Sequence, residues 1–248
     1  MNILVINPNI SLSVTELIHN EARRAALPDT RITMATAPFG VAYIETPGEA
    51  AVGAYATLQL LAQQQADHDV AVIAAFGDPG VAAAKELLDI PVVGLTESAV
   101  AAAFLLGGRF AIVGISQRIG AWYVQTVEQL GLSSRMTGYR GLKQGFASVG
   151  TVQHEAREVL REMCLSCVEQ DGADSIILAG APLAGLAREI ADDVPVPLID
   201  GVGSAIRMAE ALGRAGYTPR RSGAMSPPPM KAHQGLQDGL ASLIGRQP

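Results

Sequence analysis

Apolar residues gather along the chain in short runs that alternate with longer amphipathic stretches. Eight runs have the length and composition of β-strands: 3–7, 31–36, 70–76, 91–95, 110–115, 135–139, 175–179 and 197–199. Alanine-rich segments with helical spacing, such as 14–26 and 81–88, separate most of them. The runs lack strict alternation of apolar and polar residues, which is typical of parallel strands covered by helices on both faces. The pattern predicts an α/β fold built on parallel sheets.

The order of these elements repeats about halfway along the chain. A fixed shift aligns Ile90-Pro91 with Val196-Pro197 and Ser98-Ala99 with Ser204-Ala205. We therefore expect two pseudo-symmetric Rossmann-like lobes, each a mostly parallel four-stranded sheet flanked by helices, with a cleft between them. The expected boundaries are 1–96 plus 206–248 for the first lobe and 97–205 for the second. After Tyr217 a segment rich in Pro, Ser and Gly predicts a surface excursion, followed by a last helix over 236–244.

Composition narrows the class of protein. A chain of 248 residues that is 49% hydrophobic can bury a large core. Its 18 basic and 24 acidic residues include no basic run longer than a pair, which argues against a nucleic-acid partner. No apolar segment is long enough to span a membrane, and the first residues lack the segments of a signal peptide. These features predict a soluble, cytoplasmic protein that acts on a small molecule.

The two cysteines, Cys164 and Cys167, form a C-x-x-C within a segment of helical spacing. A redox or metal site of this kind needs a turn, a strand context or a second pair of ligands, and the sequence offers none. We expect both thiols to be structural and to lie on or beside one buried helix face.

Polar side chains follow several of the expected strands, at the edge where parallel sheets place their active sites. In "INPNIS" (6–11), Asn9 and Ser11 precede a helix and suit either an anion site or an ordinary helix cap. In "AAFGDPG" (74–80), Ala75, Phe76 and Gly77 lead to Asp78, which suits a helix cap or a group that faces a ligand.

The remaining strand ends supply further candidates. "GISQR" brings the hydroxyl of Ser116 and the amide of Gln117 to the same edge. "LAGAPLAG", with Gly180 and Ala181, is the counterpart of the 74–80 turn in the second repeat. Asp200 ends the last strand, and both Asp78 and Asp200 could act as bases if burial raises their pKa values.

Cofactor sites are not visible in the sequence. There is no glycine-rich nucleotide-binding motif, no lysine at a strand end for pyridoxal phosphate, and no pair of histidines with metal-ligand spacing. We expect neither a cofactor nor a metal.

Four motifs occur together in order: "INPN" at 6–9, "AYIE" at 42–45, "FGDPG" at 76–80 and "PVPLIDGV" at 195–202. With them the chain resembles the hydantoin racemase branch of the aspartate/glutamate racemase superfamily over nearly its whole length. The resemblance implies two pseudo-symmetric lobes, cofactor-independent chemistry at a carbon next to a carbonyl, and a homo-oligomer. It also implies one catalytic cysteine from each lobe, at positions that here hold Ala75 and Gly180.

A methyl group and a hydrogen cannot exchange protons, so the two-thiol mechanism does not carry over. The "AYIE" motif makes Tyr43 a candidate for substrate binding and Glu45 a candidate carboxylate, although Glu45 could equally be an exposed loop acid. One hypothesis is thiol-independent isomerisation, hydrolysis or group removal on a small cyclic ureide or an amino-acid-derived carboxylate. The alternatives are a racemase remnant or cysteine-replaced variant that binds ligand without racemising it, and a non-catalytic scaffold.

Overall fold

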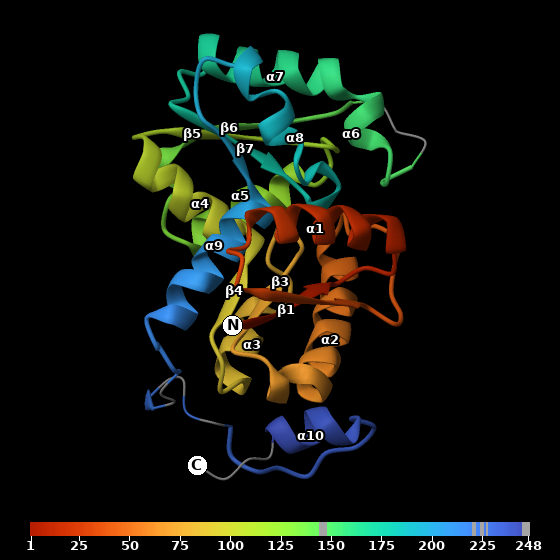
Figure 1. The fold of residues 1–248 in the computed structure, drawn as a ribbon. Helices are drawn as coiled ribbons and strands as arrows, with labels where there is room; N and C mark the ends of the chain where they lie inside the picture. The colour runs from red at the N-terminus through yellow and green to blue at the C-terminus, as the bar shows by residue number, and fades with distance from the viewer. Residues whose placement is uncertain (144–147, 220–221, 224–225, 227, 245–248) are drawn as a thin grey trace.

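The computed structural model describes residues 1–143, 148–219, 222–223, 226 and 228–244, and it contains two four-stranded sheets (Figure 1). The order is β2-β1-β3-β4 in the first sheet and β6-β5-β7-β8 in the second. All the strand pairs are parallel. The strands are β1 (Asn2–Asn7), β2 (Arg31–Thr36), β3 (Val70–Ile73), β4 (Val92–Gly94), β5 (Phe110–Gly114), β6 (Met136–Gly141), β7 (Ser175–Ala179) and β8 (Leu198–Asp200). The identical order confirms the predicted fold class.

A middle layer of helices lies between the two sheets (Figure 1). It consists of α1 (Leu12–Ala25), α4 (Leu95–Leu106), α5 (Gly120–Gln129) and α9 (Gly201–Arg214). Ile3 and Val5 of the first sheet and Phe110 and Ile112 of the second belong to one continuous buried cluster with these helices. The two lobes therefore share a core.

Further helices cover the outer face of each sheet. α2 (Pro47–Gln64), α3 (Val81–Leu87) and α10 (Asp238–Ile244) pack around Leu4 and Ile6, while α6 (Val152–Glu155), α7 (Arg157–Glu169) and α8 (Leu186–Glu189) pack around Ala111 and Val113. Successive residues of one strand thus enter opposite cores, because side chains alternate across a sheet. This explains why the strands read as continuous apolar runs.

The chain crosses between the lobes twice. α4 follows β4 of the first sheet but packs against α9, β7 and β8, and α9 follows β8 but packs back on β3 and β4. The predicted boundaries at 96/97 and 205/206 remain a prediction.

Six of the eight strands differ from their expected ranges, five of them by one or two residues at an end and β3 by three. β3 stops at Ile73 instead of residue 76, because Gly77 and Asp78 have φ of 96° and 51° and form a turn in which the Asp78 amide donates to the Ala75 carbonyl (3.2 Å). α1 begins at Leu12, directly after its capping residue Ser11.

After Tyr217, residues 220–221, 224–225 and 227 of the expected surface excursion lie outside the described residues. α10 packs on α2 through the buried side chains of Leu240 and Leu243. Within the described residues, no helix combines the length and the apolar character that crossing a membrane requires.

Candidate active site

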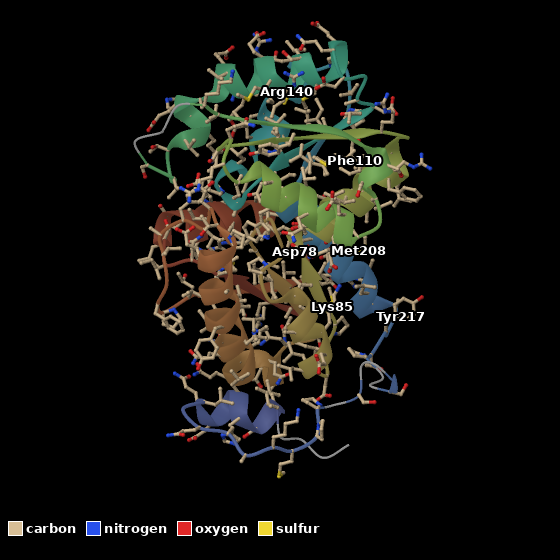
Figure 2. The ribbon with its side chains drawn as sticks, turned by 180° about the vertical axis from the view of Figure 1, so that it is seen from behind. Asp78, Lys85, Phe110, Arg140, Met208 and Tyr217 are labelled. Carbon is tan, nitrogen blue, oxygen red and sulfur yellow. The ribbon has the colours of Figure 1, made fainter. Side chains whose placement is uncertain are left out.

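The carboxyl ends of the two sheets meet through side chains that pack across the lobes. The Phe76 and Tyr123 rings lie edge to face with centroids 4.7 Å apart. A Cβ atom on Gly77 would lie 2.4 Å from the nearest atom of the Trp122 ring, so the turn after β3 needs glycine there for space as well as for its positive φ. We call this region the interlobe seam, made by Glu45, Phe76, Gly77, Ser116, Trp122, Tyr123 and Tyr139. Figure 2 shows Asp78 at the same level, where the two halves of the molecule meet.

Glu45 lies at the seam on the segment between β2 and α2. Thr46 caps α2 in a capping box, and the Glu49 carboxylate accepts hydrogen bonds from the backbone amides of both Glu45 (2.8 Å) and Thr46 (2.9 Å). These bonds fix the backbone that carries the Glu45 side chain. The Glu45 carboxylate accepts a short hydrogen bond from the Ser116 hydroxyl of the other lobe. The half-buried Glu45 side chain thus joins the lobes directly.

Ser116 is held from both sides. Its hydroxyl accepts a hydrogen bond from the Arg118 amide (3.2 Å), and its carbonyl accepts one from the Tyr139 hydroxyl. Gln117, which we expected to bind substrate, uses its side-chain oxygen to accept the Gly141 amide (3.2 Å). Gln117 therefore ties the β5 loop to β6, a role that its position in the sequence did not reveal.

Asn9 is 6% exposed at the end of β1, and its side chain is oriented by its neighbours. Its Oδ1 atom accepts hydrogen bonds from Asn7 Nδ2 (3.1 Å) and from the Ser11 amide (2.9 Å). The Nδ2 donors of Asn9 have no partner within the part of the chain that the structure describes. Ser11 itself caps α1 by accepting the Val14 amide (3.4 Å). Of this pair, Asn9 has donors left for a ligand.

Asp78 and Asp200 both cap helices. The two carboxylate oxygens of Asp78 accept the Thr96 (2.8 Å) and Glu97 (2.9 Å) amides at the start of α4. Asp200 accepts the Gly203 amide (2.8 Å) at the start of α9, together with the Gly185 amide (2.6 Å).

The two helix-capping carboxylates come from different positions in the two lobes. Asp200 is the last residue of β8, and its topological equivalent at the end of β4 is Gly94. A Cβ atom on Gly94 would lie 2.4 Å from Asp78 Cγ. In the first lobe, the Asp78 side chain reaches the end of β4 from the turn after β3. In the second lobe, the corresponding position at the end of β8 is filled by the side chain of Asp200 itself.

Burial raises the pKa of Asp78 to about 7, against the lowering effect of the two amide bonds, and burial likewise raises the pKa of Asp200. Folded Asp78 therefore holds its proton at pH values where the unfolded chain has lost it.

We expect Asp78 to lower the free energy of unfolding as pH rises from about 4 to about 7, by about 1.4 kcal/mol for each pH unit. Urea unfolding across this range should give a flatter pH dependence for Asp78→Asn than for the wild type. The exposed control Asp192→Asn should follow the wild type, and a wild-type slope in Asp78→Asn would contradict the prediction.

The other expected binding residues are small or largely buried. Tyr43 packs against both cores, and burial together with the Glu45 charge raises its pKa. Ala75 is 9% and Ala181 4% exposed, and Gly180 has φ of 109°. Four cavities of about 540, 520, 470 and 620 Å³ lie elsewhere, and none of these four is lined by Ala75 or Gly180. Ala75, Phe76 and Ala181 are thus enclosed at the seam, whereas Gly180 is partly exposed.

Both cysteines lie far from the seam, on α7 at the outer face of the second sheet (Figure 1). They are free thiols and fully buried, as the sequence predicted. Burial raises the pKa of Cys164 to about 12 and that of Cys167 to about 11.

Because the thiolate is the reactive form of cysteine, we expect iodoacetamide to leave the native protein unmodified at pH 8 and to alkylate both thiols after denaturation. Intact-protein mass spectrometry measures this, and rapid modification of the native protein would contradict the burial.

Sequence reasoning missed the aromatic residues of the second lobe. The chain has one Trp and five Tyr. Trp122, Tyr123 and Tyr139 nevertheless all lie at the seam, where the Tyr123 and Tyr139 ring centroids are 5.9 Å apart. Aromatic residues make up 4% of the chain, so the adjacent Trp122-Tyr123 pair was the available signal. It was easily mistaken for ordinary core.

The sequence and the fold of this chain are similar to those of known proteins. The family model for Asp/Glu/Hydantoin racemase matches residues 3–209. The chain belongs to the Asp/Glu/hydantoin racemase family. A hydantoin racemase from Paenarthrobacter aurescens is 34% identical over 235 residues, which cover 94% of this chain and 100% of the relative. An allantoin racemase from Klebsiella pneumoniae superposes with a TM-score of 0.91 at 33% identity, covering 97% and 98% of the two chains. An allantoin racemase from Pseudomonas fluorescens gives 0.89 at 29% identity, covering 95% and 100%.

Membership in the Asp/Glu/hydantoin racemase family supports the expected isomerase-type activity on a small molecule. Within the described residues, no group of three His, Cys, Asp or Glu side chains has a metal-binding arrangement. The polar groups at the seam are one carboxylate (Glu45), two phenols (Tyr123 and Tyr139) and one hydroxyl (Ser116), with the Asn9 amide nearby.

Proposed function

We propose that this racemase-family protein catalyses proton transfer at the carbon next to a carbonyl of a small cyclic ureide, or of a related amino-acid-derived carboxylate, without a thiol. The observation that carries the proposal is the Glu45 carboxylate, bound to Ser116 across the seam at the carboxyl ends of both sheets. Parallel α/β folds place their ligands at this edge. A carboxylate oriented by one hydrogen bond keeps lone pairs with which to accept a proton.

The hydrogen bonds that each carboxylate accepts suggest which of them removes the proton. Both oxygens of Asp78 and both oxygens of Asp200 already accept backbone amides, so we assign these residues to helix capping and proton removal to Glu45. Asn9 presents amide donors whose direction is fixed by two accepted hydrogen bonds, and it would stabilise the negative charge that develops on the substrate carbonyl. Tyr43 and Ser116 would complete the substrate site, beside the small residues Ala75 and Gly180.

Substrate contact with Ala75 or Phe76 would require movement at the seam, because both residues are less than a tenth exposed. The Glu45–Ser116 hydrogen bond, which joins the lobes, would have to break as the seam opens. Closure over the bound ligand would exclude water and strengthen the electrostatic effects at the seam.

The experiment is incubation of the protein in heavy water with the separate enantiomers of several 5-substituted hydantoins, allantoin, aspartate and glutamate. Mass spectra and chiral chromatography are recorded against blanks without protein, because hydantoins also racemise unaided. The proposal predicts deuterium at the α-carbon of a cyclic ureide, with inversion and no other change in mass. A changed product mass without exchange would instead indicate hydrolysis or group removal.

A second candidate function is ligand binding without turnover. Gly180, with φ of 109°, has a backbone conformation that a cysteine would adopt only under strain, which favours a site that has departed from two-thiol chemistry. In that case heavy water would leave no label in any substrate, while calorimetry would still detect binding of a cyclic ureide. Recovery of racemisation by an Ala75→Cys/Gly180→Cys variant would then identify a racemase remnant.

A further inference from the structure

Tyr123 is a buried phenol at the centre of the seam. It projects from α5 and is 3% exposed, with its ring against Phe76 (4.7 Å between centroids) and Tyr139 (5.9 Å). These aromatic contacts hold the ring in one orientation, because edge-to-face packing restricts its rotation. The position of the hydroxyl group is therefore well defined.

The hydroxyl faces the place where a side chain of residue 180 would begin. Two atoms would lie within 4 Å of a Cβ atom on Gly180. They are Pro182 Cδ at 3.6 Å and Tyr123 Oη at 3.8 Å. Since residue 180 is glycine, the phenol is the functional group that borders this space. Within the described part of the chain, the Tyr123 hydroxyl makes no hydrogen bond. Its oxygen is not among the fully enclosed polar atoms without a partner, so it borders accessible space, where a ligand atom would be a natural acceptor.

The surroundings keep Tyr123 protonated. Burial is the main cause of its raised pKa, and Tyr43, Tyr139, Asp78 and Glu45 act in the same direction. The resting residue is therefore protonated at neutral pH, which is the form that donates a proton. Glu45, an acidic neighbour on the opposite lobe, provides the complementary acceptor.

We propose that Tyr123 donates the proton on the second-lobe face of the substrate, in the place that a thiol at position 180 would serve. The role rests on the proposed function. The Glu45 carboxylate removes the α-proton on one face and leaves a planar enolate. The Tyr123 O–H bond then breaks as a C–H bond forms on the opposite face, which inverts the centre. In the reverse direction the tyrosinate removes the α-proton of the opposite enantiomer and the protonated Glu45 donates to the other face. Between turnovers both groups return to their starting forms by exchange with water, so protons and charge balance.

The test is Tyr123→Phe, which removes one hydroxyl and keeps the ring contact with Phe76. Each enantiomer of a substrate labelled by the wild type is incubated in heavy water, and exchange and inversion are measured separately. The wild type should exchange both enantiomers. The variant should exchange only the enantiomer whose α-hydrogen faces Glu45, with retention of configuration, and its inversion rate should fall at least about 100-fold.

Tyr55→Phe is the matched control, since Tyr55 is a partly exposed phenol on α2 that contacts Phe39. It should behave as the wild type, and near-ultraviolet circular dichroism checks the packing of both variants. Exchange of both enantiomers by Tyr123→Phe, or of neither with an unchanged fold, contradicts the role of Tyr123. A wild type that exchanges neither enantiomer overturns the proposed function and this role with it.

Discussion

Glu45→Gln should lower the rate of α-hydrogen exchange by about 10²–10⁴-fold, the range that a positioned general acid or base contributes. Gln can still accept the Ser116 hydrogen bond through its side-chain oxygen, so the contact between the lobes should persist, but an amide cannot take up the proton. The initial rate of deuterium incorporation into the best cyclic ureide measures the effect. Because binding should persist, the loss should appear in kcat more than in KM.

The matched control for this change is Glu16→Gln, which makes the same substitution at an exposed position of α1. It should leave the exchange rate unchanged. Exchange by Glu45→Gln within a factor of about three of the wild type, in a folded protein, would remove Glu45 from the chemistry and return attention to the remaining carboxylates at the strand ends.

Gly77→Ala should produce the largest loss of stability among single methyl additions at the seam. The new Cβ atom would meet the Trp122 ring at 2.4 Å, and an alanine would also have to adopt φ of 96°. Backbone strain of this kind costs about 1–3 kcal/mol, and overpacking costs about as much again. We expect the free energy of unfolding to fall by about 2–6 kcal/mol, measured by urea denaturation.

Gly131→Ala separates the two causes. Gly131 also has a positive φ, of 74°, but nothing lies within 4 Å of the Cβ position. Its cost should be the backbone strain alone, and the difference between the variants reports the contact with Trp122. Adding Trp122→Leu to Gly77→Ala should cost less than the sum of the single changes, because the two residues touch. Equal losses for Gly77→Ala and Gly131→Ala would show that the lobes do not press together at this point.

Most of the fold could be predicted from the apolar runs. β2 and β7 have the predicted ends, and the repeat of four strands per sheet follows from the repeat of elements. The end of β3 could not be predicted, because Ala75 and Phe76 continue the apolar run although the strand has ended at Ile73. An apolar side chain packs equally well from a strand or from a turn against the other lobe.

The site was harder to predict for a related reason. Asp78 accepts amides that follow it by 18 and 19 residues, and Glu45 binds a hydroxyl 71 residues away, so local sequence does not show which partner each carboxylate takes. Tyr123 looked like a core residue because it is one, apart from a hydroxyl that borders Gly180. The carboxyl edge of the sheets was predictable, whereas the contacts across it depend on how the two lobes pack.

The most direct test of the central claim is the exchange rate of a chain without any thiol. Cys164→Ala/Cys167→Ala removes both cysteines, which lie on α7 and are remote from the seam. If the chemistry depends on Glu45 and not on sulfur, this variant should label the α-carbon of the best cyclic ureide in heavy water at the wild-type rate. Loss of labelling, in a variant whose circular dichroism matches the wild type, would contradict thiol-independent proton transfer.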